Sequence, residues 1–323
     1  KLHFCCLTNC SKITARSLHA VLKNCPILMN LHTTGYSDLE EAFKSLSKPA
    51  RLRSFVAEDC QVTGLSVQLM GLLMPRLLIL HLCTPNSSVQ DADIDVLVQS
   101  CPDISVLELG QFQLLGDASL ISIATHLKGI SDLRLVLSGN STITDHGVIG
   151  LAGLSGLTNL SIVGSNNITD ESIRVVCAQL SGLSGLNVSE CMNLTDRAFD
   201  TTASTHLTRL NVSGTQVNGA FSDVLLKKGE EEYTLCLLTC DNCNVLTDAL
   251  VDFVLSRPLL YNVSLRGCRL SHASWMRFAQ LSGGAKVCFM DISHSTHVRG
   301  DVIRCFKQNS PSMALTADGL CVV

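Results

Sequence analysis

The sequence contains few charged residues and few aromatic residues. Of its 323 residues, 16% are charged and 4% are aromatic, while 46% are hydrophobic. Globular proteins average about 25% charged residues, so this chain is unusually poor in charge. Intrinsic disorder requires low hydrophobicity combined with high charge, which excludes a disordered chain. The formal net charge is −4 and the pI is about 6.2, which argues against a basic nucleic-acid-binding protein.

Long apolar runs are missing as well. A membrane-spanning helix needs a run of about 18 or more apolar residues, and no uncharged run of that length occurs in the sequence. Length alone favours roughly two domains, at about 150 residues each. The internal pattern of the sequence favours a different organisation.

One pattern recurs from end to end: Leu-x-x-Leu-x-Leu-x-x-Cys, two further residues, and then Ile/Leu-Thr-Asp. Its clearest copies are LSGLNVSECMNLTD at 183–196, LTNLSIVGSNNITD at 157–170 and LCLLTCDNCNVLTD at 235–248. The ninth position of the aligned copies falls on Cys10, Tyr36, Cys60, Pro85, Phe112, Asn140, Ser165, Cys191, Thr215, Cys243, Cys268 and Ser295. The mean spacing of about 26 residues is typical of stacked repeats.

Each copy predicts a short strand followed by a helix. The alternating Leu-x-Leu segment is typical of a strand with one buried face. The ninth residue turns inward, and the Thr-Asp step supplies oxygens that can accept from the orphan N–H groups of a helical first turn. Residues Ile173, Val176, Cys177 and Leu180 are spaced as on one helix face. One copy cannot bury its own face, so the copies must stack into one array.

The cysteine at position nine and the Leu-Thr-Asp after it resemble the cysteine-containing leucine-rich repeats. The resemblance covers roughly residues 2–315. It implies an α/β solenoid, a leucine-rich-repeat horseshoe of about twelve strand–helix repeats with a parallel inner sheet. We therefore expect a single leucine-rich-repeat domain over residues 1–323 instead of two domains.

Two groups of proteins carry repeats of this kind. One is the F-box/leucine-rich-repeat proteins, which are substrate receptors of cullin-type ubiquitin ligases, and the other comprises axonemal and other cytoskeletal proteins. No F-box precedes the array, which begins inside a repeat and ends on a bare strand-like segment, Met313–Leu315. Both ends are expected to leave apolar edges that missing chain or partners cover, so we expect the chain to be part of a longer protein.

The sequence offers no convincing catalytic, cofactor or metal site. Phosphate-loop, dinucleotide and nucleophile-elbow motifs are all absent, and we expect neither an enzyme nor a cofactor. The pair Cys240 and Cys243 falls on inward positions, and His294 and His297 form a lone pair, so neither set is a metal site. Many of the 16 cysteines fall on inward repeat positions, where free thiols behave as small hydrophobic groups. This pattern favours a reducing, intracellular location.

Outward strand positions line the concave face of such arrays, which is the usual binding surface. Their side chains are small and mostly neutral, with isolated charges and neither a basic stripe nor an aromatic ladder. The sixth repeat is expected to place Val136 in the middle outward column. The candidate partner-binding residues are His32, Val56, Glu58, Asp59, His81, Glu108, Arg134, Asn187, Glu190, Arg209, Asn211, Asp241, Arg266, Asp291 and His294.

Together these features predict a non-catalytic protein-interaction scaffold within a larger cytoplasmic assembly, with a cytoskeletal or ciliary assembly as one form of it. The partner is expected to be a protein, not a nucleic acid or a membrane. Two alternatives stay open. The repeat subclass favours the substrate-recognition arm of an F-box-type ubiquitin ligase, and the nine Asn-x-Ser/Thr sequons leave room for an extracellular leucine-rich-repeat receptor, although several fall within the predicted strands.

Overall fold

The fold is described from a computed structural model of the chain. It describes residues 2–8, 10, 12–35, 38–44, 46–85, 87–199, 207–221, 227–228, 232–317 and 320–322. The chain divides into two units, residues 1–167 and 168–323, and each is described by itself. The expectation of a single domain stays a prediction.

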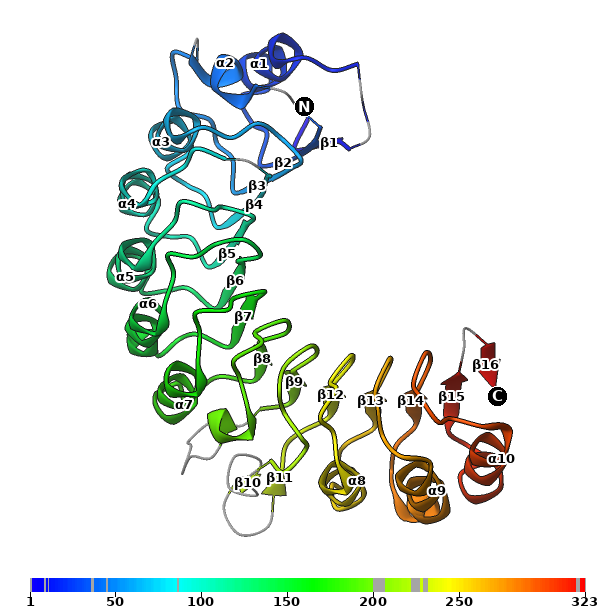
Figure 1. Ribbon diagram of the computed structural model, residues 1–323. Helices are drawn as coiled ribbons and strands as arrows, with labels where there is room; N and C mark the ends of the chain where they lie inside the picture. The colour runs from blue at the N-terminus through cyan, green and yellow to red at the C-terminus, as the bar shows by residue number, and fades with distance from the viewer. Residues whose placement is uncertain are drawn as a thin grey trace. The chain divides into compact units, whose positions relative to one another are not determined.

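The first unit alternates strands with helices. Its strands are β1 (Phe4–Leu7), β2 (Asn30–Thr34), β3 (Ser54–Glu58), β4 (Ile79–Cys83), β5 (Val106–Gly110), β6 (Asp132–Val136) and β7 (Asn159–Val163). The helices between them are α1 (Ala15–Asn24), α2 (Leu39–Lys44), α3 (Gly64–Leu73), α4 (Asp91–Ser100), α5 (Asp117–His126) and α6 (Asp145–Gly150), which continues into the short 3₁₀ helix η1 (Leu151–Gly153). Each strand pairs in parallel with the next, and the helices form a second layer (Figure 1).

The second unit follows the same plan with more variation. Its parallel strands are β8 (Gly185–Asn187), β9 (Arg209–Asn211), β12 (Leu237–Thr239), β13 (Asn262–Ser264), β14 (Phe289–Asp291) and β15 (Ala314–Ala317). Its helices are α7 (Asp170–Gln179), α8 (Asp248–Leu255), α9 (His272–Leu281) and α10 (Gly300–Asn309), with 3₁₀ helices η2 (Asp196–Phe199) and η4 (Ser282–Gly284). Between β9 and β12 lies an antiparallel hairpin of β10 (Lys227–Lys228) and β11 (Glu232–Tyr233).

The core of each unit lies between the strand layer and the helix layer. In the first unit the central inward strand residues from β2 to β7, each at most 1% exposed, are Leu31, Phe55, Leu80, Leu107, Leu133 and Leu160. In the second unit the corresponding residues are Leu186, Leu210, Leu238, Val263, Met290 and Leu315, each at most 2% exposed. The predicted face of α7 is fully buried too. Strand–helix alternation, parallel pairing and this thin continuous core confirm the predicted solenoid fold.

The Thr-Asp step starts helices as predicted, but its two side chains have different roles. Thr144 and Thr247 are N-cap residues whose hydroxyls accept the N–H two residues on, at 3.2 and 3.3 Å. The following aspartate instead reaches the next repeat. Asp170 accepts the backbone N–H of Thr195 at 2.7 Å through Oδ1 and the Thr195 hydroxyl at 2.6 Å through Oδ2. The motif therefore fastens one repeat to the following one as well as starting a helix.

Two expectations about the ends of the array need correction. The last strand is not bare, because β15 pairs antiparallel with β16 (Leu320–Val322), which covers its backbone edge. Cys10 was expected to turn inward like the other ninth-position residues, but it is exposed. Pro85, at the ninth position of the fourth repeat, is exposed as well, and Tyr36 lies outside the described residues. Among the described residues, the first repeat has a neighbouring repeat on one side, and Leu2 and Phe4 are about half exposed, at 45% and 53%.

Candidate functional site

The strand register arranges the outward side chains of the first unit in columns. The middle column joins Cys6, His32, Val56, His81, Glu108, Arg134 and Ser161. The sequence prediction placed Val136 there and was wrong by two residues: Val136 pairs with Gly110 and Val163 in the next column. The sixth repeat has two extra residues after β6, so counting back four positions from Asn140 stops at Val136, two residues short of Arg134.

Asn140 itself is inward, as predicted, because it closes the lengthened turn. Its Nδ2 donates to the carbonyl oxygens of Phe112 at 2.9 Å and Leu115 at 2.8 Å. Its Oδ1 accepts the backbone N–H groups of Thr142 and Ile143, each at 3.0 Å. An asparagine with all these bonds can be buried at low cost, which explains why this polar residue stands where most repeats have cysteine, serine or threonine.

A charged group lies across β4, β5 and β6, and we call it the β4–β6 charge cluster: His81, Glu108, Asp132 and Arg134. Glu108 lies between two neighbours, with its Oε2 at 3.7 Å from Nδ1 of His81 and 3.6 Å from an Nη of Arg134. Arg134 also donates two hydrogen bonds to Asp132, at 3.0 and 2.8 Å. Three candidates therefore meet at one place. Sequence reasoning missed Asp132, although strand alternation places it outward two residues before Arg134.

The imidazole of His81 is half-buried, and this burial determines its charge. Burial lowers its pKa below the usual value, with Arg134 and His32 acting in the same direction and Glu108 and Asp132 opposing them. Its Nε2 is buried and has no hydrogen-bond partner among the described residues. The imidazole is therefore neutral at pH 7, and the cluster has a net negative charge from two carboxylates and one guanidinium.

Two further candidates, Glu58 and Asp59, lie near the same cluster. Burial raises the pKa of the Cys83 thiol, and the carboxylates of Glu108, Asp59 and Glu58 raise it further. Cys83 packs over Gly110, where a Cβ atom would lie only 2.7 Å from Sγ. The backbone N–H of Asp59 donates to the Cys83 carbonyl at 2.9 Å. This part of the strand face is thus an acidic patch around a half-buried thiol.

The remaining candidates of the first unit contribute less to the surface. Val56 is only 8% exposed, so little of it can touch a partner. His32 stacks edge-to-face with Phe4, with 5.7 Å between ring centroids. It belongs to the apolar edge at β1 and not to the charge cluster.

In the second unit the middle column is the predicted one: Asn187, Asn211, Thr239, Ser264 and Asp291. Three of these side chains have a local structural role. The Oδ1 atoms of Asn187, Asn211 and Asp291 accept the N–H of the residue two positions on, at 3.1, 3.0 and 2.9 Å. Such bonds stabilise a turn at the strand end, so substituting these residues would perturb the turn as well as the surface.

A polar network crosses β12, β13 and β14, and we call it the β12–β14 polar network: Asp241, Ser264, Arg266 and Asp291. Asp241 Oδ1 accepts the Ser264 hydroxyl at 2.6 Å and the backbone N–H of Arg266 at 2.9 Å. The Arg266 side chain is exposed, and its Nε lies 3.7 Å from Asp291 Oδ2. The structure therefore brings three predicted residues together on this unit as well.

The other candidates of the second unit lie apart from this network. Glu190 and His294 occupy the left-handed turn just after their strands, with φ of 60° each. Arg209 is exposed at the first position of β9, in an outward column that continues through Leu237 and Asn262 to Phe289. Sequence reasoning passed over this column. Phe289 is 36% exposed and the adjoining Tyr261 is 46% exposed, and aromatic side chains often anchor interfaces.

Two pairs in the sequence resemble metal-binding motifs, Cys240 with Cys243 and His294 with His297. Cys240 and Cys243 are buried, and burial raises the pKa of both thiols. Among the described residues, no group of three or more histidine, cysteine, aspartate or glutamate side chains could hold a metal ion. The 15 cysteines whose side chains the structure describes are free thiols. No helix in the described residues is long and apolar enough to cross a bilayer.

Comparison with known proteins agrees with this geometry. A family model described as "Leucine Rich repeat" matches residues 203–220. One similar solved structure is the yeast complex of Rad7 and Elc1. This chain superimposes on a chain of that complex with a TM-score of 0.50 and 15% sequence identity, and the match covers 95% of this chain and 84% of that one. A second is the TLR13–ssRNA13 complex, with a TM-score of 0.55 and 15% sequence identity. That match covers 94% of this chain and 41% of the other chain.

The chain has a leucine-rich-repeat fold. At 15% identity these likenesses show the fold alone. This chain spans less than half of the TLR13 chain it matches. A leucine-rich-repeat fold is a protein-interaction module, typically without catalytic activity, in which stacked repeats present one extended surface.

Proposed function

We propose that this leucine-rich-repeat protein is a non-catalytic scaffold that binds a protein partner on its strand faces. The observation that carries the proposal is the β4–β6 charge cluster. Four charged or polar side chains from three successive strands meet on one surface, and the Arg134 side chain is 47% exposed. Exposed charges set the orientation and rate of protein association more than its affinity, which suits a surface read by shape and charge.

The second unit supports the same proposal through the β12–β14 polar network and the exposed Phe289 and Tyr261. Arg266 is exposed, and aromatic and arginine side chains are enriched at the energetically important positions of interfaces. We further propose a cytoplasmic assembly, cytoskeletal or ciliary, as the setting, with ends of the array covered by partners or by further chain. The buried free thiols are in keeping with a reducing compartment.

A ubiquitin-ligase substrate arm is the second candidate. The cysteine-and-Leu-Thr-Asp repeat favours it, and Cys191, Cys243 and Cys268 are fully buried at the ninth position, as that repeat type requires. Affinity purification of the full-length protein from its own cells separates the two candidates. Co-purification of a cullin adaptor supports the ligase arm, whereas cytoskeletal proteins without any adaptor support the scaffold.

Charge reversal on the strand face then tests where the partner binds. Arg134→Glu and Arg266→Glu each replace an exposed side chain, and we expect either change to weaken capture of the purified partner at least tenfold. Arg76→Glu, an exposed residue outside the strands, is the matched control. We avoid Asp291→Lys because Asp291 accepts the N–H of Ser293. Unchanged capture by both variants would move the binding site to the helices or the ends.

A further inference from the structure

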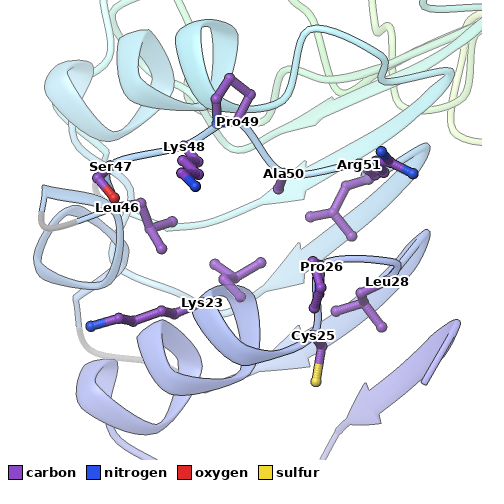
Figure 2. Close-up of a pocket in the computed structure, with 12 residues that line it drawn as sticks. Lys23, Cys25, Pro26, Leu28, Leu46, Ser47, Lys48, Pro49, Ala50 and Arg51 are labelled. Carbon is purple, nitrogen blue, oxygen red and sulfur yellow. The ribbon is translucent and has the colours of Figure 1, made fainter. Parts of the chain in front are cut away.

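A cavity of about 450 Å³ opens in the first unit, between the last turn of α1 and the segment that leads from α2 into β3 (Figure 2). This α1–α2 cavity lies among helix ends and connections and contains none of the strand-face candidates. Its volume is within the usual range of about 300–1,000 Å³ for ligand sites. The residues that line it come from two stretches only, 22–28 and 46–52.

The length of α2 explains why the cavity exists. Helix α2 has 6 residues, whereas its neighbours α1 and α3 have 10 each. A helix rises about 1.5 Å per residue, so α2 stops about 6 Å short of the length of α1. The segment 46–52 that follows cannot continue the helix through Pro49, because proline lacks the N–H and clashes with the preceding turn. The last turn of α1 is thus left without a full helical neighbour.

The lining combines an apolar floor with a positive rim. Leu22, Leu28 and Leu52 are buried beneath it. Lys23, Lys48 and Arg51 are exposed around it, and none of the lining residues is acidic. No carboxylate lies within ion-pair distance of these three cations in the portion of the chain that the structure describes. The cavity therefore presents uncompensated positive charge beside apolar surface, on a chain whose net charge is −4.

The arrangement of the cations indicates the shape of the occupant. Figure 2 shows Lys23 and Arg51 at opposite ends of the cavity and Lys48 on the wall between them. They do not converge on one point, as they would around a single phosphate. A chain with several carboxylates along its length fits this spacing, and a side chain entering between them would meet the leucine floor.

We propose that the α1–α2 cavity binds an acidic segment of a protein partner, with one apolar side chain in the cavity and flanking carboxylates paired with Lys23, Lys48 and Arg51. Pro26 and Pro49 restrict the backbone on both walls, so the site is largely formed before binding, which lowers the entropic cost of association. The site is separate from the strand faces and goes beyond the proposed function.

Phage display with a random heptapeptide library on the intact chain tests the proposal. We expect the enriched peptides to carry aspartate or glutamate on both sides of an apolar residue. The fluorescein-labelled consensus peptide is then titrated against purified variants by fluorescence anisotropy. The triple variant Lys23→Glu/Lys48→Glu/Arg51→Glu should bind it at least tenfold more weakly. The matched variant Lys12→Glu/Arg16→Glu/Arg76→Glu changes the net charge equally at exposed positions outside the cavity and should bind it as the wild type does.

Two more measurements separate the cavity from general charge attraction. Ser47→Trp places a bulky ring at an exposed lining position without changing charge, and it should also weaken binding at least tenfold. Bound peptide should slow the alkylation of Cys25, which lines the cavity, but not that of the exposed Cys288.

The proposal is overturned if no peptide is enriched, if the enriched peptides lack acidic residues, or if the two triple variants bind the peptide equally. Circular dichroism and denaturation midpoints must match the wild type for each variant compared. Arg134→Glu should keep full peptide binding, so a failure of the strand-face proposal and a failure of this one give different results.

Discussion

The carboxylate of Asp117 holds Thr144 of the next repeat at two points. Its Oδ1 accepts the Thr144 backbone N–H and its Oδ2 accepts the Thr144 hydroxyl, both at 2.7 Å. Asp170 holds Thr195 in the same way. Each contact joins the first turn of one helix to the N-cap of the following repeat, so the Thr-Asp motif couples neighbouring repeats.

Replacing Asp170 by asparagine should therefore destabilise the protein. Asparagine keeps one acceptor oxygen and presents an NH₂ where the second acceptor was, so one Thr195 donor loses its partner. Leaving such a group unsatisfied costs about 1–3 kcal/mol. Asp248→Asn is the control: Asp248 follows the N-cap Thr247, yet no bond joins its carboxylate to the next repeat in the described residues. Urea denaturation should show a lower free energy of unfolding for Asp170→Asn only. Equal losses in both variants would mean that the aspartate acts through its charge at the helix N-terminus and not through its bonds to Thr195.

Gly147 permits the Asp117 contact, because a larger residue would collide with it. A Cβ atom at this position would lie 3.0 Å from the Cα of Asp117 and closer still to its carboxylate. Gly147→Ala should lower the free energy of unfolding by about 1–3 kcal/mol, the usual cost of overpacking. Gly153→Ala has no atom within 4 Å of the new Cβ and should be near neutral. Thermal denaturation of both variants checks this, and a stable Gly147→Ala would contradict the close approach.

The turn just after each strand is left-handed in many repeats, as at Gly35, Glu190 and His294, with φ of 73°, 60° and 60°. A side chain in this conformation costs about 1–2 kcal/mol. Glu190→Gly and His294→Gly should therefore stabilise the protein by up to about 1 kcal/mol, since glycine also loses more chain entropy on folding. Gly35→Ala should destabilise the protein, because alanine is strained in this left-handed conformation. The new Cβ atom would meet no other atom within 4 Å, so backbone strain is the whole effect. Chemical denaturation that ranks the variants in the opposite order would refute this account.

The pH dependence of stability should contain a contribution from His81. Burial lowers the pKa of His81 in the folded state below its usual 6.5, so the unfolded chain binds this proton more readily. The contribution of His81 to the free energy of unfolding is therefore fully present above pH 6.5, and it is lost as the pH falls from there towards the folded-state pKa. His81→Gln should flatten this part of the curve between pH 7.5 and 5. His3→Gln, at an exposed position, is the control variant, and a slope that survives His81→Gln would disprove the assignment.

The cysteines should differ strongly in reactivity. Burial raises the pKa of Cys101, Cys177 and Cys268 to about 12, so these thiols are almost wholly protonated at pH 8. The thiolate is the reactive species. Hydrogen bonds with the Thr8 side chain and backbone lower the pKa of the exposed Cys6 thiol.

N-ethylmaleimide should therefore label Cys6 first and the three buried cysteines only after unfolding. Mass spectrometry of peptides from a labelling time course measures the order. Rapid native labelling of Cys177 would contradict the tight helix–sheet packing around it. Addition of urea provides the positive control, because it should make all the sites react.

The sequence by itself determined the repeat and the fold. The central buried residue of each strand from β2 to β7 is a leucine, except for Phe55 in β3. The threonine before the aspartate is an N-cap at Thr144, Thr169 and Thr247. These features are local: they depend on strand alternation and on the bonding needs of a helical first turn. Because the pattern recurs about every 26 residues, the same features appear in many copies, and a few irregular copies do not obscure them.

Only the tertiary structure decided what happens between repeats. The two extra residues after β6 shift Arg134 into line with Glu108, and counting along the chain cannot locate such an insertion. The bond from Asp117 to Thr144 joins residues 27 positions apart, and the α1–α2 cavity depends on α2 being shorter than its neighbours. Each feature arises from how one repeat is stacked on the next, and stacking is a relation in space that a single repeat's sequence does not contain.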